Sequence, residues 1–350
     1  METIIRTIDY DNMDLEIIKQ AAKIIKDGGI VAFPTETVYG LGANALNEKS
    51  VEKIYNAKGR PSDNPLIVHI SSNKELYSLV ESVKLKAQML MDLFWPGPLT
   101  LIFPKSNLIP DTITAGLSTV AIRMPDNKIA RELIKYSGVP IAAPSANISG
   151  RPSPTNASHV IKDLNGKVDM ILDGGEVKVG LESTVLDVTG DIPTILRPGG
   201  ITREMLEEAI GEVLIDPAII SDKELLSTPM SPGMKYKHYA PKAQVIIVEG
   251  EINKVIKKIK SLAEEKQKQN IRVGIMATEQ TKNNYKTGFI LSVGDRNKPE
   301  TIAAKLFDCL RAFDEEGVEI ILSESFSYEK IGFAIMNRLK KAAGHNILKV

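Results

Sequence analysis

Residues 58–65 (KGRPSDNP) place two cations and several small polar side chains directly ahead of an apolar segment that carries His69. An arginine guanidinium is a planar fork that matches phosphate oxygens, and a lysine ammonium is a compact positive charge. Ser62 and Asn64 add short neutral donors, and the two prolines restrict the backbone. This combination predicts a rigid loop that holds an oligophosphate group. A solvated basic turn is the alternative interpretation.

The predicted loop is not a Walker loop, because the pattern G-x-x-x-x-G-K-[ST] occurs nowhere in the sequence. No nucleophile elbow G-x-S-x-G is present either, and the single cysteine, Cys309, has no reactive context. His69, His159 and His238 are far apart in the sequence, which gives no sign of a histidine metal cluster. The chain is therefore expected to bind anions and orient reacting groups without a protein nucleophile.

Small polar residues and arginines recur at the ends of predicted strands, where α/β sheets commonly bind ligands. They occur in the segments AFPTETVYGLG (32–42), APSANISG (143–150), GLESTVLD (180–187) and ILRPGG (195–200). Arg123 lies inside an apolar strand predicted over 120–124, and a buried arginine needs an anionic partner. That partner is either a structural carboxylate or the carboxylate of a substrate.

The elements that must position these groups alternate between strand and helix patterns in the first part of the chain. Strands are predicted over 30–33, 66–70, 99–103, 120–124, 168–173, 183–188 and 194–198. Helices are predicted over 14–29, 50–59, 74–94 and 202–211 and after Asn127. Ser50 is the expected N-cap of the second helix. Because several strands follow one another directly, the pattern favours a mixed α/β sheet with helices packed on it over a purely parallel sheet.

Residues 212–242 have the composition of a linker, yet they contain Tyr236, Tyr239 and several lysines. From residue 243 onward, strand patterns alternate with amphipathic helix patterns, which predicts βαβ units and a second, parallel sheet. We therefore expect a first domain over 1–211, a linker over 212–242 and a second domain over 243–350.

The composition is that of a globular protein, with 350 residues, 43% hydrophobic residues and 25% charged residues. Lys plus Arg equals Asp plus Glu at 44 each, so no overall charge drives binding to nucleic acid, although a local basic groove stays open. One cysteine excludes an intramolecular disulfide and fits a reducing compartment. No apolar run approaches the roughly 20 residues of a membrane-spanning helix, and no secretory signal pattern opens the chain. We expect a cytoplasmic protein.

Six motifs, in their order and spacing, closely resemble those of the YrdC-like threonylcarbamoyl-AMP synthases. They are PTETVYGLG (34–42), KGRPSDNPLIVH (58–69), STVAIRMP (118–125), APSANISG (143–150), ESTV (182–185) and LRPG (196–199). The segment SPGMKYKHYAP (231–241), followed by an α/β domain, resembles the longer, two-domain branch of this family. The resemblance covers essentially the whole chain.

The resemblance implies an α/β fold with a twisted, mixed open sheet and a smaller Rossmann-like C-terminal domain. It implies that the protein condenses ATP, L-threonine and bicarbonate into L-threonylcarbamoyladenylate and diphosphate, which is a nucleotidyltransferase reaction. A partner complex then transfers the threonylcarbamoyl group to the tRNA adenosine beside the anticodon. Mg²⁺ is expected to arrive with the ATP, with no dedicated protein metal site and no tightly bound organic cofactor. The linker is expected to close over the site as a lid that excludes water.

By motif position, the resemblance also implies two groups of binding residues. L-Threonine would be bound by Thr37, His69, Arg123, Ala143 and Ser183, with Arg123 pairing with the carboxylate. ATP would be bound by Arg60, Asn64, Thr119, Ser145, Ser153, Arg197 and Tyr236. Lys58 and Arg60 would act catalytically by neutralising phosphate charge, with Ser62 close to the phosphates. Tyr239 is the alternative to Tyr236, and His69 taken alone is also compatible with an ordinary core histidine.

Two other functions fit parts of the pattern. Hydrogenase-maturation carbamoyltransferases contain a similar domain, but they carry cysteine-paired zinc fingers, and this chain has one cysteine. A module that binds double-stranded RNA through its phosphates would need a basic concave face, which a net charge of zero does not favour. Weak RNA binding through a local groove stays open.

Overall fold

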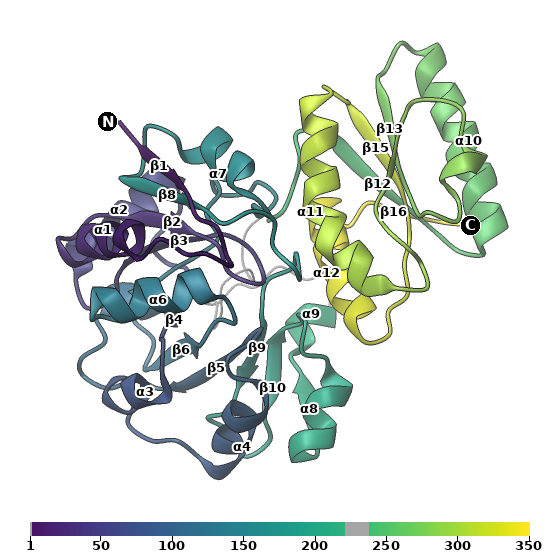
Figure 1. Ribbon diagram of the computed structural model, residues 1–350. Helices are drawn as coiled ribbons and strands as arrows, with labels where there is room; N and C mark the ends of the chain where they lie inside the picture. Colours follow the sequence, from purple (N-terminus) through teal and green to yellow (C-terminus); the bar gives the residue numbers. More distant parts are fainter. Residues whose placement is uncertain (1, 221–237) are drawn as a thin grey trace. The chain divides into compact units, whose positions relative to one another are not determined.

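The computed structural model describes residues 2–220 and 238–350, which form two compact units (Figure 1). The first unit contains the described residues of 2–149, 153–178 and 182–220, and the second contains 150–152, 179–181 and 238–350. The predicted linker, 212–242, falls largely on residues outside this description, so its boundaries and its role as a lid stay predictions.

Among the described residues, the first unit is built on one sheet with the strand order β1-β8-β2-β3-β7-β4-β6-β5-β9-β10-β11. Its strands are β1 (Ile4–Thr7), β2 (Val31–Phe33), β3 (Gly40–Asn44), β4 (Ile67–His69), β5 (Leu99–Pro104), β6 (Thr119–Arg123), β7 (Ile141–Ala142), β8 (Met170–Asp173), β9 (Thr184–Asp187), β10 (Thr194–Arg197) and β11 (Leu214–Ile215). Parallel pairs such as β4–β6 and β5–β9 alternate with antiparallel pairs such as β5–β6 and β9–β10. The mixed sheet predicted from the sequence is therefore confirmed.

Helices pack on both faces of this sheet. They are α1 (Leu15–Lys26), α2 (Glu48–Lys58), α3 (Asn73–Leu79), α4 (Leu85–Phe94), α5 (Asp111–Thr114), α6 (Lys128–Ser137), α7 (Ala157–Leu164), α8 (Arg203–Ile210) and α9 (Pro217–Ile220). On one face, Ile18 of α1 and Leu133 of α6 share a buried cluster with Phe33 of β2. On the other face, residues of α2, α3, α4, α7 and α8 share a larger core with the strands.

Helix α6 shows how local sequence sets these elements. The side chain of Asn127 accepts a hydrogen bond from the Ala130 N–H at 3.1 Å, which caps the first turn. Ile129 and Leu133, four residues apart, are buried on one side of the helix. Gly138 ends the helix with a φ of 65°, a left-handed conformation that glycine adopts without strain.

Two sequence-based expectations about helices were wrong. Helix α2 begins at Glu48, because the side chain of Asn47 caps it by accepting from the Ser50 N–H at 3.2 Å; Ser50 is not the N-cap. The helix predicted over 74–94 is two helices, α3 and α4. Val80 leaves the helical conformation to form an antiparallel bridge with Lys105, which ends α3.

The second unit has a parallel sheet in the order β14-β13-β15-β12-β16. Its elements are β12 (Gln244–Glu249), α10 (Ile252–Lys268), β13 (Val273–Ala277), η1 (Lys282–Asn284), β14 (Phe289–Ser292), α11 (Pro299–Glu315), β15 (Ile320–Glu324), α12 (Ile331–Ala342) and β16 (Ile347–Lys349). Helix α10 covers one face, and α11 and α12 cover the other (Figure 1). The predicted βαβ organisation is confirmed. Within the described part of the chain, no helix has the length and apolar character needed to span a bilayer.

The segment after β10 lies directly against the backbone ahead of β9. A Cβ atom on Gly199 would lie 2.3 Å from the Thr184 N and 2.6 Å from the Glu182 O, which is too close for any side chain. We expect Gly199→Ala to lower the free energy of unfolding by about 1–3 kcal/mol, the usual cost of overpacking. Urea unfolding followed by circular dichroism measures this change.

Gly190→Ala is the matched control, because the nearest atom to its added Cβ is the Ile192 O at an ordinary 3.6 Å. The control is expected to stay within about 1 kcal/mol of the native chain. Equal stability of the two variants would contradict the close approach at Gly199.

Candidate functional site

A row of polar side chains crosses one face of the first sheet. In the strand register, His69 of β4 lies opposite Arg123 of β6, and Arg123 lies opposite Thr100 of β5. Residues directly opposite each other in a sheet place their side chains on the same face. The hydroxyl of Ser183 lies 2.7 Å from the Thr100 hydroxyl and accepts a hydrogen bond from Nη2 of Arg197 at 3.1 Å. These five residues are called the polar row below.

The polar row lies beyond the part of this face that α1 and α6 cover. Ile141, which pairs with His69, still belongs to the cluster formed with those two helices. Farther along the sheet, the apolar cluster beside the row contains strand residues only: Ile67, Ile102, Ala121, Val185 and Leu196. The row therefore lies where the helical cover of this face ends.

Arg123 has three polar partners outside the row. Its Nε donates to the Gly97 carbonyl at 3.2 Å, its Nη1 donates to the Thr37 hydroxyl at 2.9 Å, and its Nη2 lies 2.6 Å from Oε1 of Glu36. Arg123 is 4% exposed and Glu36 is 6% exposed. A buried guanidinium requires such an anionic partner. In the described structure this partner is the carboxylate of Glu36. Of the two partners that the sequence left open, a protein carboxylate and a substrate carboxylate, the structure contains the first.

The loop between β2 and β3, residues 34–39, brings Glu36 and Thr37 to Arg123. Its conformation is held by Thr35, whose hydroxyl accepts from the N–H groups of Thr37 and Val38 at 3.1 and 3.2 Å. The two ends of the loop meet where Phe33, the last residue of β2, pairs with Gly40, the first residue of β3. Strands β3 and β4 both run antiparallel to β7, so β3 starts at the same edge of the sheet as β4. Arg123 closes β6 at the opposite edge. The loop therefore extends over the face that carries the polar row.

His69 is an uncharged member of the row. Burial, and to a smaller extent the positive charge of Arg123, lowers the pKa of His69 to about 3. Its Nδ1 lies 3.2 Å from the Ile67 carbonyl oxygen, which can only accept a hydrogen bond. The contact therefore requires the proton on Nδ1 and leaves Nε2 as an acceptor.

The two cations that open the sequence analysis hold backbone carbonyls. Nζ of Lys58 donates to the carbonyl oxygens of Ser145 and Asn147 at 2.5 and 2.6 Å, and Lys58 is 2% exposed. Nη2 of Arg60 donates to the carbonyl oxygens of Asn64 and Pro65 at 3.2 and 3.1 Å. These contacts fix the loop ahead of β4 and tie the end of α2 to the segment after β7.

The sheet separates the sequence-predicted residues into two groups. Strands β4 and β6 are parallel, and the predicted ATP residues Arg60, Asn64, Thr119 and Ser145 lie at the edge where these strands begin, with Lys58 beside Ser145. The polar row contains the predicted threonine residues His69, Arg123 and Ser183, and Thr37 contacts it. Arg197, predicted for ATP, lies in the polar row instead of at that edge.

The remaining predicted residues have varied surroundings. Ser153 donates to Oε1 of Glu182, which directly precedes Ser183. Ala143 is buried, and its N–H donates to the Ile67 carbonyl at 2.9 Å; Ser62 is exposed. Tyr236 lies outside the described residues. Tyr239 is buried in the second unit with its ring stacked on Phe307, 5.2 Å between centroids.

Sequence reasoning missed Glu36 and Thr100. Glu36 lies inside the quoted motif PTETVYGLG, between two threonines, and its being the one charged residue of that motif was the available signal. Thr100 is the one polar residue of the strand predicted over 99–103, which marks a position that faces other polar groups.

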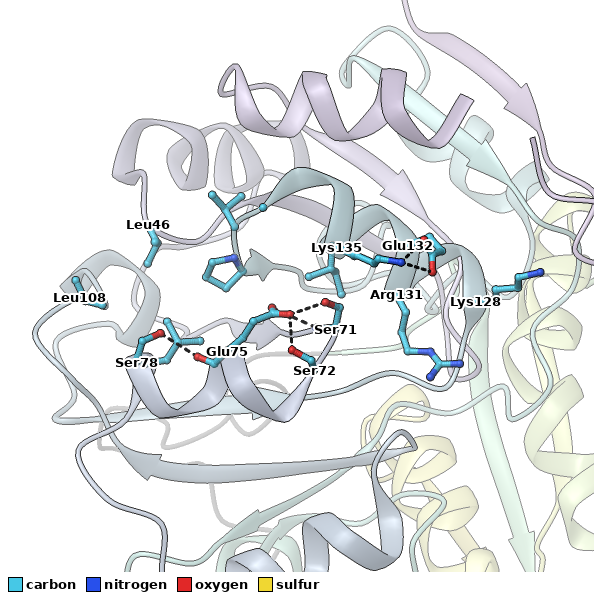
Figure 2. A pocket seen from close by; sticks show the side chains of 15 residues that line it. Leu46, Ser71, Ser72, Glu75, Ser78, Leu108, Lys128, Arg131, Glu132 and Lys135 are labelled. Carbon is cyan, nitrogen blue, oxygen red and sulfur yellow. Dashed lines mark hydrogen bonds and ion pairs between the residues drawn. The ribbon is translucent and has the colours of Figure 1, made fainter. Parts of the chain in front are cut away.

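A separate groove of about 850 Å³ lies between α3 and α6 (Figure 2). Leu46 and Leu108 lie toward one end, Lys128 and Arg131 toward the other, and Glu75 accepts hydrogen bonds from the Ser71 and Ser72 hydroxyls between them. No sequence-predicted site residue lines this groove. Across the described part of the chain, no cluster of three His, Cys, Asp or Glu side chains could hold a metal ion.

Comparison with known proteins gives matches along both units. The Sua5–YciO–YrdC family model, described as "Telomere recombination", matches residues 23–199. A second model, described as "Threonylcarbamoyl-AMP synthase, C-terminal domain", matches residues 201–344.

Proteins named threonylcarbamoyl-AMP synthase are similar over nearly the whole chain. The protein of Bacillus subtilis is 52% identical, covering 95% of this chain and 94% of its own, and that of Pyrococcus abyssi is 50% identical, covering 95% and 96%. The crystal structure of P. abyssi Sua5 complexed with L-threonine has a TM-score of 0.95 at 49% identity, with 99% and 100% of the two chains covered. The chain therefore belongs to the threonylcarbamoyl-AMP synthase family, in its two-domain form.

Proposed function

We propose that this protein condenses ATP, L-threonine and bicarbonate into L-threonylcarbamoyladenylate and diphosphate, for the threonylcarbamoyl modification of tRNA. The observation that carries the proposal is full-length similarity to a structure complexed with L-threonine, together with a buried arginine beside hydroxyl groups and a neutral histidine. An amino acid with a hydroxyl side chain needs these groups: a guanidinium for its carboxylate and neutral partners for its hydroxyl.

The two ends of the site suit the two halves of the reaction. The edge where β4 begins, with Lys58, Arg60, Asn64, Thr119 and Ser145, is suited to ATP. The polar row is suited to L-threonine, with Arg123 as the carboxylate partner and Nε2 of His69 as an acceptor for the hydroxyl. The threonine amine, in its unprotonated form, forms a bond to the carbon of CO₂ with release of a proton, or of bicarbonate with release of water. An oxygen of the resulting carbamate then attacks the α-phosphorus while diphosphate leaves.

Alignment and charge neutralisation are what this chemistry requires of the protein. Lys58 fixes the segment after β7, and Arg60 fixes the loop ahead of β4, so both are positioned to preorganise the phosphate end. Mg²⁺ is proposed to enter with ATP on the phosphate oxygens, which hard cations prefer. Transfer of the threonylcarbamoyl group from the adenylate to tRNA belongs to a separate partner complex.

Product analysis tests the proposed function directly. Incubation with ATP, L-threonine and bicarbonate is expected to give the mass of threonylcarbamoyl-AMP, and diphosphate release is expected to require all three substrates. A module that only binds RNA releases no diphosphate. Diphosphate release that is independent of L-threonine would contradict the assignment.

Arg60→Ala tests the phosphate end. Loss of the guanidinium is expected to cost about 2–4 kcal/mol of transition-state stabilisation, which corresponds to a fall in kcat/KM of roughly 30- to 1000-fold. Diphosphate release measures the rate, and thermal unfolding is expected to stay close to that of the native chain. Arg203→Ala, which removes an exposed arginine paired with Glu207 on α8, is the matched control and should keep full activity. Near-native turnover by Arg60→Ala would exclude the role.

His69→Gln tests the neutral state of His69. The folded pKa of about 3 lies below the unfolded value of about 6.5, so on acidification the unfolded chain takes up a proton that the folded chain does not. His69 therefore costs stability as the pH falls from about 6.5 toward 3. Between pH 7 and pH 5, the native chain is expected to lose about 2 kcal/mol more unfolding free energy than His69→Gln. A difference between the two proteins that does not change with pH would show that His69 is charged or exposed.

A further inference from the structure

Glu36 is a buried carboxylate with unused hydrogen-bonding capacity. Its Oε1 lies 2.6 Å from Nη2 of Arg123, which supplies charge compensation. Neither of its oxygens, however, accepts a well-aligned hydrogen bond from any residue that the structure describes, and both are shielded from solvent. Buried polar atoms nearly always have a hydrogen-bond partner, so such a pair of oxygens beside a predicted substrate site indicates a missing group.

We propose that Glu36 binds the ammonium group of the amino-acid substrate, an inference that rests on the function proposed above. An ammonium carries three N–H donors, which the two oxygens of Glu36 lack, and its positive charge suits a carboxylate. Arg123 and Glu36 then form a matched pair that receives the carboxylate and the ammonium of one zwitterion. Because the pair and the zwitterion are each neutral overall, the buried site gains no net charge when the substrate enters.

Among the charged and titratable side chains described around the polar row, Glu36 is the one suited to an ammonium. Arg123 and Arg197 are positively charged and repel an ammonium. His69 is neutral, and its Nε2 offers a single lone pair without charge. Glu182 is the nearest other acid in sequence to the polar row, and its Oε1 already accepts from the Ser153 hydroxyl at 2.5 Å. The loop 34–39 is therefore a specificity element that selects ligands with a free amine.

A ligand that lacks the amine but keeps the carboxylate distinguishes binding of the ammonium by Glu36 from orientation of Arg123 by Glu36. The compound 2,3-dihydroxybutanoate, with the configuration of L-threonine, keeps the carboxylate and the side-chain hydroxyl and replaces the ammonium by a hydroxyl. If Glu36 binds the ammonium, Glu36→Gln weakens L-threonine strongly and 2,3-dihydroxybutanoate little. If Glu36 only orients Arg123, the substitution weakens both ligands equally, because both depend on the guanidinium.

Isothermal titration calorimetry of the full-length native protein and of Glu36→Gln, each with both ligands, measures the four affinities that are compared. We expect native protein to bind L-threonine at least about 10-fold more tightly than the dihydroxy acid. Glu36→Gln is expected to lose about 10-fold or more in affinity for L-threonine and less than about 2-fold for the dihydroxy acid. Glu207→Gln, which changes a partly exposed acid on α8, is the control and should bind both ligands as the native protein does.

The outcomes are distinct. Equal losses for both ligands in Glu36→Gln, or no loss for L-threonine, would overturn the role of Glu36. If Glu36→Gln does not fold, Glu36→Asp, which keeps the charge on a shorter side chain, is expected to retain the native preference for the amine in part. Native protein that binds the two ligands equally well would also overturn it. Native protein that binds no L-threonine would instead contradict the proposed function.

Discussion

The burial of the Arg123 guanidinium is the constraint on which the site depends. A charge removed from water must be compensated by partners held in fixed positions. Arg123 has them from two segments distant in sequence: Glu36 and Thr37 from one loop, and the Gly97 carbonyl from the residues just ahead of β5. Those partners fix the loop 34–39 over the sheet. The cost of burying the charge is thus met by contacts that also shape the substrate end of the site.

The short-range pattern predicted much of this arrangement, because it is encoded locally. The helix expected after Asn127 is α6, and the alternation after residue 243 predicted the parallel sheet. Asn47 competed successfully with Ser50 as N-cap, a choice among similar residues that composition alone does not decide. The short edge strands β1 and β16 were not predicted, since their pairing with β8 and β12 depends on distant residues.

The site shows the same contrast between features encoded locally and features that depend on distant residues. Lys58, Arg60 and Asn64 are recognisable because they are neighbours in the sequence. The link between Thr100, Ser183 and Arg197 is not, because it arises only when β5, β9 and β10 lie side by side in one register. Whether Arg123 pairs with the protein or with a ligand could not be decided from the strand alone. The structure gives it Glu36, and the ligand-binding roles stay predictions drawn from the family.

Strand β4 has only three residues, and this length sets the distance between the loop ahead of it, which is proposed for ATP, and His69, which is proposed for L-threonine. Ile67 and His69 are two positions apart along the strand, a step of about 7 Å. Because side chains alternate between faces, inserting one residue would turn the imidazole to the opposite face of the sheet, and inserting two would move it a further ~7 Å from the start of β4. The distance from the start of β4 to His69 can therefore change only in steps of two residues if the imidazole is to stay on the same face.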